Sequence, residues 1–330
     1  MDKMNTITLF LYNIVVYSIP LLYGTVGEII TEKSGSLNLG VEGIMAVGAL
    51  FGYLAGCRAN SMLLGVVVAF LSAALCGLLF ALLTVTLQAN QNVTGLTITT
   101  FGLGLYFFVG NGVKNRSWPV MTDSSSLQAG WADIELPLLS RIPVIGKGLF
   151  THNILIYLGV AIAVLAWWYL NHTKTGLRLR AIGENPAAAD SLGVNIALYK
   201  FVHIMLGAGI MGIGGYYMGL NMSGSLSSNC WINGYGWISV ALVIFSNWNP
   251  LAAILGTFVF GFFNTLRISG GSLANTFPGT LGWLGNVPAQ FLQMLPFVIT
   301  AIVLIAYSVR KNKHTNAPAA IGVNYYREDR

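Results

Sequence analysis

The sequence predicts an all-α, polytopic membrane protein with about 8–10 transmembrane or re-entrant helices, two of them broken. Apolar residues make up 55% of the chain and charged residues only 8%, with a mean hydropathy of +0.68. A soluble domain carries roughly 25% charged residues. Apolar runs long enough for a hydrocarbon core of roughly 30 Å recur along nearly the whole chain, and two polar, Gly-rich segments interrupt them. We therefore expect one membrane domain over residues 1–330.

The predicted spans are the apolar runs of the chain in order: residues 7–30, 38–56, 62–88, 93–113, 153–171, 200–220, 235–248, 251–268 and 288–309. The first run lacks a basic segment before it and a small-residue cleavage site after it, so we expect a retained span and not a signal peptide. The cysteines Cys57, Cys76 and Cys230 are far apart and odd in number. They predict neither a disulfide framework nor a zinc site.

Three polar segments give the orientation: a loop at 114–151, a loop at 172–199 and a tail at 310–330. Four predicted crossings separate the second loop from the tail, so both lie on one side of the membrane. Their Lys and Arg residues make that side the cytoplasm by the positive-inside rule. The 114–151 loop is then external. Nine full crossings would place the N-terminus outside, whereas one re-entrant segment would place it inside, and both alternatives stay open.

Small residues at four-residue spacing predict close helix packing in two of the spans. One face carries Gly65, Ala69, Ala73, Gly77 and Ala81, and the sixth span carries the pairs Ala208/Gly212 and Gly215/Gly219. Residues four apart share a helix face, and small ones let the backbone of a second helix approach. We interpret both faces as packing surfaces.

The two predicted breaks both contain the tetrapeptide Ser-Gly-Ser-Leu, at 34–37 and at 223–226. Glu42, in the apolar run after the first break, would cost several kcal/mol against lipid, so it must face protein or water. Polar, irregular backbone at membrane depth is typical of a solute path. The residues predicted to line this path are Asn38, Glu42, Asn92, Asn229, Trp231 and Asn233. The alternative is that both breaks are short external loops that share four common residues.

Motifs of catalysis are missing from the sequence. It contains no Walker A pattern, no His-Glu-x-x-His and no Gly-x-Ser-x-Gly, and its four histidines are isolated. We therefore expect a transport subunit without its own ATPase site, cofactor or metal. The net charge of +6 comes from residues at span ends and in the tail, where lipid headgroups and topology explain it. No nucleic-acid partner is expected, and no ring of acids indicates an ion channel.

The second loop carries the most specific motif. Pro186 and Gly193 predict the start and end of a short amphipathic helix. The sequence Gly183-Glu184-Asn185-Pro186, followed by Ala188-Ala189 and Gly193, resembles the coupling-helix loop of ABC importer permeases. The resemblance implies that these residues dock on a separate ATPase subunit, which closes on ATP. The alternative is a solvated amphipathic loop.

Further segments extend the resemblance over most of the chain: "GEII", "GSLNLGVEGIMAVGA" and "GWISVALVIFSNWNPLAAILGTFVFGF". In this order they are similar to permeases of the branched-chain amino acid, ribose and nucleoside importer group, and most similar to the nucleoside branch. One departure is Gly234-Tyr235-Gly236, where many relatives have Gly-Arg-Gly, so a charged contact is lost and the solute stays open.

The resemblance implies the function and the partners. It implies a nucleoside importer in the bacterial cytoplasmic (inner) membrane, with a second homologous permease, two ATP-binding cassette subunits and an external substrate-binding lipoprotein, all in contact with membrane lipid. Alternatives are a permease for ribose or another simple sugar, for a branched-chain amino acid, a stand-alone secondary transporter, or an intramembrane enzyme. A zwitterionic amino acid would want a fixed charge pair, which the few intramembrane charges beyond Glu42 do not favour. A secondary transporter leaves the Gly-Glu-Asn-Pro loop unexplained, and an enzyme would need clustered acids or histidines.

Overall fold

The computed structural model describes residues 3–114, 133–135, 140, 142–223, 230–310 and 317–326. The long helices are α1 (Lys3–Glu32), α2 (Val41–Ala59), α3 (Met62–Ala81), α4 (Gln91–Lys114), α7 (Ile154–His172), α10 (Ile196–Met218), α12 (Pro250–Thr276) and α14 (Ala289–Arg310). The shorter elements are η1 (Leu82–Thr86), β1 (Ile134–Glu135), α6 (Ile145–Leu149), β2 (Thr151–His152), α8 (Lys174–Glu184), α9 (Pro186–Ser191), η2 (Gly219–Ser223), α11 (Tyr235–Phe245), α13 (Pro278–Leu281) and η3 (Gly282–Asn286).

Helices long and apolar enough to cross a membrane dominate the described residues. Seven qualify, namely α1, α2, α3 with η1, α4, α7, α10 with the start of η2, and α12, and α11 and residues 290–299 are shorter apolar helices. These nine segments coincide with the nine predicted runs. The all-α, polytopic prediction is thus confirmed.

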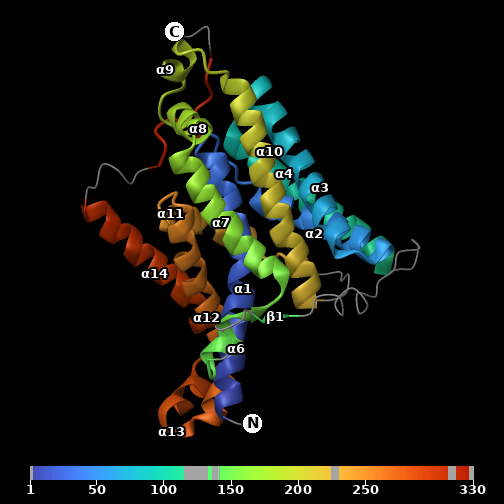
Figure 1. Ribbon diagram of the computed structural model, residues 1–330, viewed down its shortest axis with the longest axis vertical. Helices are drawn as coiled ribbons and strands as arrows, with labels where there is room; N and C mark the ends of the chain where they lie inside the picture. Colours follow the sequence, from blue (N-terminus) through green and yellow to red (C-terminus); the bar gives the residue numbers. More distant parts are fainter. Residues whose placement is uncertain are drawn as a thin grey trace.

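The two ends of the helix bundle differ in what they carry (Figure 1). The N-terminus, α6 and α13 lie at one end, and α8, α9 and the C-terminus lie at the other. A backbone hydrogen bond from Ala320 N to Gly183 O (2.9 Å) joins the tail directly to α8. The second loop and the tail therefore share one side, as predicted. The start of α1 lies at the opposite end of the bundle.

Polar caps set many of the helix boundaries. The side-chain oxygens of the N-cap residues Ser61, Asn153, Thr173, Asn185, Asn195 and Asn249 accept backbone N–H bonds from the first turns of α3, α7, α8, α9, α10 and α12. Such caps satisfy N–H groups that have no partner within the helix. Pro186 and Pro250 follow two of these caps, where proline suits the first helical position.

The bundle centre is built on close backbone contacts between α1, α2, α3 and α10. A Cβ placed on Gly27 would lie 2.5 Å from Gly207 O, and one on Gly212 would lie 2.5 Å from Ala69 O. Only glycine permits such distances between helix backbones. Gly77 faces Ala208 in the same way. The two predicted small-residue faces therefore pack against each other, which confirms that interpretation.

A two-residue hairpin connects the end of the first loop to α7. Ile134 pairs with His152 and Glu135 with Thr151 in antiparallel register. His152 is fully buried, and its ring lies 4.6 Å from that of Tyr12 on α1. Burial lowers the pKa of His152 to about 4. Much of the 114–151 loop lies outside the described residues.

Candidate functional site

The two breaks meet inside the bundle at the carboxylate of Glu42. Its Oε1 accepts a hydrogen bond from Gly234 N (2.6 Å), and its Oε2 accepts one from Gly236 N (2.7 Å). Glu42 is only 4% exposed. The left-handed backbone of Asn233 and Gly234 turns the chain into α11 at this point. A carboxylate on the N-terminal N–H groups of a helix is favoured both by hydrogen bonding and by the helix dipole. The expectation that Glu42 faces protein is confirmed.

A second acid holds the other end of α11. The indole Nε1 of Trp248, in the turn after α11, donates to the buried Glu32 Oε2 at the end of α1. Asn247 and Trp248 both adopt positive φ values, 55° and 53°. A bulky residue rarely takes this conformation, so the surrounding contacts must hold it. One break in the chain, 33–40, is thus flanked by two acids that grip α11 at both ends.

The backbone of residues 33–40, between these two acids, forms hydrogen bonds with side chains of the bundle. Asn38 N donates to Glu28 Oε1 (3.1 Å), and Leu37 N donates to Gln91 Oε1 on α4 (2.7 Å). Asn38 is buried, its Oδ1 accepts from Gly40 N (2.8 Å), and its Nδ2 has no partner in the described part of the chain. Side chains therefore supply the partners that a regular helix would have supplied.

Three aromatic rings lie beside the Glu42 joint. The ring of Trp231 lies 5.1 Å from that of Tyr53 on α2 and 5.5 Å from that of Tyr106 on α4, both edge-to-face. Trp231 also packs on Gly219 of η2. Its indole Nε1 is buried without a hydrogen-bond partner among the described residues. Buried indole N–H groups usually have one, and residues 224–229, just before Trp231 in the chain, lie outside the described residues.

A cationic group that the sequence analysis missed lies next to Tyr235. Asn264 Nδ2 donates to Tyr235 Oη (2.6 Å), and Arg267 donates to Asn264 Oδ1 from Nη2 (3.1 Å) and Nε (3.3 Å). The Gly-Tyr-Gly departure thus does not remove positive charge from this region, because α12 supplies it. The sequence held one signal for this group: Arg267 is a single charged residue inside an apolar span, and such a residue must face protein or water.

The predicted path residues do not all converge. Glu42 and Trp231 lie at the joint, Asn38 lies just before α2, and Asn233 is exposed in the turn that leads into α11. Asn92 is exposed in the first turn of α4 and lies apart from the joint. Asn229 lies outside the described residues. The first Ser-Gly-Ser-Leu segment contacts the tail, because Gly35 O accepts from Gly322 N (3.2 Å). Residues 224–226 of the second segment lie outside the described residues.

The α8–α9 loop has the boundaries that the sequence predicts. α9 begins at Pro186, is capped by Asn185 Oδ1 accepting from Ala188 N (3.0 Å), and is followed by Gly193 at a φ of 77°. Gly183 and Ala189 are buried, whereas Glu184, Asn185, Ala188 and Gly193 are exposed. Leu192 is 83% exposed.

The α8 end of this loop rests on the first break. A Cβ on Gly183 would lie 2.5 Å from Lys33 O, so α8 and the break are in backbone contact. Burial lowers the pKa of Lys33, and the nearby Glu184 carboxylate opposes this effect.

The C-terminal tail, which the sequence analysis could not interpret, holds this end together. Asn324 Nδ2 donates to Gln88 O (2.7 Å), Gln91 Nε2 donates to Asn324 Oδ1 (2.9 Å), and Tyr325 Oη donates to Asp190 Oδ2 (2.9 Å). Residues 317–326 thereby join the segment after η1, the start of α4, α8 and α9.

Comparison with known proteins gives matches over almost the whole chain. The chain is 36% identical to the nucleoside ABC transporter permease protein NupC of Lactococcus lactis, covering 98% of this chain and 99% of the relative. It is 30% identical to the guanosine ABC transporter permease protein NupQ of Bacillus subtilis, over the full length of both. It is 29% identical to the putative glucose ABC transporter permease protein TsgC13 of Haloferax volcanii, covering 93% of this chain and 94% of the relative.

No solved structure matches the chain significantly. The family described as the permease component of branched-chain amino acid transport systems matches residues 10–306. With nine apolar segments, a capped loop at one end and full-length similarity to ABC permeases, the chain belongs to this family of transport-system permeases.

Proposed function

We propose that this chain is the permease of an ABC importer for nucleosides and works with a second homologous permease, two ATP-binding cassette subunits and an external substrate-binding lipoprotein. The observation that carries the proposal is the full-length similarity to a nucleoside permease and a guanosine permease. As a member of its family, the chain is a multi-pass protein of the bacterial cytoplasmic membrane and a transport subunit, not an enzyme.

The joint between the breaks supplies the chemistry for a nucleoside path. A nucleoside is neutral, carries a planar base and offers hydroxyl and amide-like groups. Trp231 gives an aromatic ring with a buried N–H donor, and Asn38 gives a buried amide Nδ2; neither group has a hydrogen-bond partner among the described residues. Asn233 is exposed at the same turn. We assign these residues and Glu42 to the path, with Glu42 positioning α11. For Asn92 and Asn229 the path role stays a prediction.

The exposed face of α9 supplies the coupling surface. Ala188 of α9 and Leu192, just after it, are exposed, while the buried Ala189 anchors α9 to α8 and α10. Glu184, the last residue of α8, is also exposed, and its Oε2 accepts a hydrogen bond from Ala319 N of the tail (3.4 Å). An ATPase subunit that closes on ATP must favour one facing of the permease by a few kcal/mol to reverse the populations. A short helix with both ends capped can transmit such a bias without bending. Gly183, Asn185, Pro186 and Gly193 define its geometry.

Uptake of labelled solutes tests substrate and coupling together. Cells that carry the chain with its genomic neighbours are given adenosine, guanosine, ribose, glucose or leucine. We expect nucleoside uptake in the wild type and its loss in Glu184→Arg. Glu184→Gln separates the loss of the carboxylate from the addition of a positive charge near Lys33. The matched control is Glu135→Arg, the same change on the exposed β1 strand, which should transport normally.

Each outcome has one interpretation, provided that immunoblots show equal amounts of each variant in the membrane. Uptake that survives Glu184→Arg would refute the coupling assignment. Uptake of ribose or glucose alone would move the substrate to the sugar alternative, which the similarity to TsgC13 also supports. Uptake of leucine alone would indicate a branched-chain amino acid permease.

A further inference from the structure

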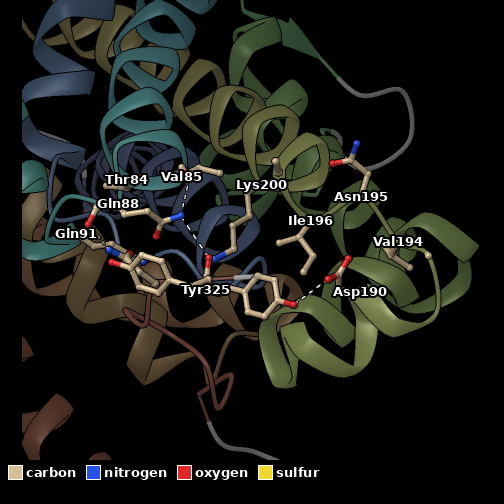
Figure 2. A pocket seen from close by; sticks show the side chains of 14 residues that line it. Thr84, Val85, Gln88, Gln91, Asp190, Val194, Asn195, Ile196, Lys200 and Tyr325 are labelled. Carbon is tan, nitrogen blue, oxygen red and sulfur yellow. Dashed lines mark hydrogen bonds between the residues drawn. The ribbon is translucent and has the colours of Figure 1, made fainter. Parts of the chain in front are cut away.

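A cavity of about 640 Å³ opens at the α8/α9 end of the molecule (Figure 2), and Glu42 is not among the residues that line it. Its walls are η1 and the residues after it, the connection from α9 to α10, the first turn of α10, and the tail. A volume of this size is in the range of small-molecule sites. Neither the proposed solute path nor the docking face of α9 uses it.

Lys200 is the charged group of this cavity. It lies in the second turn of α10, lines the cavity and is only 5% exposed. Figure 2 shows its side chain extending from α10 toward the tail at Tyr325. Within the described ranges, Lys200 makes no hydrogen bond and no ion pair. The carboxylate of the same wall, Asp190, instead accepts the Tyr325 hydroxyl. A buried ammonium without a counter-charge is costly, so an anion that enters the cavity would be bound strongly.

Gln88 adds a hydrogen-bond requirement to the charge requirement that Lys200 sets for a ligand. Gln88 Nε2 donates to Val85 O (2.8 Å) and to Tyr325 O (3.3 Å), which fixes the orientation of the amide. Gln88 Oε1 is then a buried acceptor without a partner in the part of the chain that the structure describes. A ligand that satisfies both residues must accept hydrogen bonds at one end and donate one nearby. A phosphate group with adjacent hydroxyls does this.

We propose that this cavity is a binding site for a phosphate group with neighbouring hydroxyls, with Lys200 as the anchor for the phosphate and Gln88 Oε1 as the acceptor for a hydroxyl. A soluble cytoplasmic phosphate ester and a phosphatidylglycerol headgroup both carry this chemistry. The bound group would touch the proposed coupling loop, η1 with the residues after it, and the tail at once. It would therefore bias the arrangement of these three elements.

Direct binding to the full-length chain tests the site. The purified chain is placed in nanodiscs of phosphatidylcholine, and binding of radiolabelled glycerol 3-phosphate is measured by equilibrium dialysis, with glycerol as the probe that lacks phosphate. We expect saturable binding of glycerol 3-phosphate and none of glycerol. Lys200→Met should weaken binding about tenfold or more, because a charge-assisted bond is lost. Lys200→Arg should keep it within a few-fold. Lys174→Met, at an exposed lysine of the same end, should leave it unchanged.

A second experiment, with lipid, tests whether the bound phosphate belongs to a soluble ligand or to a lipid headgroup. The same variants are extracted from mixed phosphatidylglycerol and phosphatidylcholine bilayers, and retained lipid is counted by native mass spectrometry. Lysine-dependent binding of glycerol 3-phosphate indicates a soluble ligand, and Lys200-dependent retention of phosphatidylglycerol indicates a lipid. Binding that Lys200→Met leaves intact, or absence of binding in both arms, would overturn the proposal. Because no transport is measured, this result is independent of the solute that the permease carries.

Discussion

Replacing Glu42 with Gln tests the joint between the two breaks with a change of only one atom type. The wild-type carboxylate presents two acceptor oxygens to Gly234 N and Gly236 N, at 2.6 and 2.7 Å. Glutamine keeps one acceptor and turns an NH₂ group toward the other N–H. The variant therefore loses one hydrogen bond and leaves a buried backbone donor unsatisfied, while the side chain still fills the same space.

The expected loss follows from the geometry at this position. A buried hydrogen bond to a charged acceptor contributes about 1.5–3 kcal/mol, and a negative charge at a helix N-terminus adds about 0.3–1 kcal/mol. The sum is roughly 2–4 kcal/mol. For a chain of this size, such a loss lowers Tm by roughly 4–8 °C. The Tm of Glu42→Asp should lie between those of the wild type and Glu42→Gln, because aspartate keeps the charge on a side chain that is one methylene shorter.

Thermal unfolding of the purified chain in nanodiscs, followed by tryptophan fluorescence, measures this effect. The matched control is Glu135→Gln, the same substitution on the exposed strand β1, whose Tm should stay within about 1 °C of the wild type because an exposed carboxylate contributes little. A Glu42→Gln variant with an unchanged Tm would refute the reasoning that the carboxylate holds α11 in place. An equal loss in both variants would also contradict it.

Two further predictions concern packing and pH. Gly212→Leu should lower Tm sharply, since a Cβ alone would lie 2.5 Å from Ala69 O and overpacking costs about 1–3 kcal/mol. Gly104→Leu is the control, because a Cβ on Gly104 would meet open space. An equal fall of Tm in both variants would contradict the α3–α10 contact. In the folded protein, burial lowers the pKa of His152 from an ordinary 6.5 to about 4. The unfolded chain therefore binds this proton more readily, and the free energy of unfolding falls as the pH drops from about 6.5 to about 4, by roughly 3 kcal/mol in all. Comparison of Tm at pH 7 and pH 4.5 should show a smaller fall in His152→Phe than in the wild type, and equal falls would contradict the assignment.

The membrane helices and α9 could be predicted because their signals are local. A run of apolar residues must bury its backbone hydrogen bonds internally in lipid, which leaves only a helix. Four-residue spacing of Gly65, Ala69 and Ala73 then marks the packed face. At α9, Pro186 and Gly193 each restrict the backbone within a few residues of the boundary.

The rest of the site depends on pairs of residues far apart in the chain. Glu32 and Trp248 are 216 positions apart, and Gln91 and Asn324 are 233 apart. Neither partner alone indicates the other, because the pairing arises from how the helices cross. The contact between the first break and the tail, from Gly322 N to Gly35 O, could not be foreseen for the same reason.

The first break provides a continuous physical link between the proposed coupling loop and α11. On one side, Gly183 of α8 packs on Lys33 O, and Gly35 O accepts from the tail. On the other side, Glu32 holds the turn after α11 and Glu42 holds its first N–H groups. The segment between these contacts is short and buried, with its Leu37 N–H on Gln91 and its Asn38 N–H on Glu28. We therefore expect a displacement of α8 to be passed from the proposed coupling loop to the joint at Glu42 through the break itself, and not through a long helix.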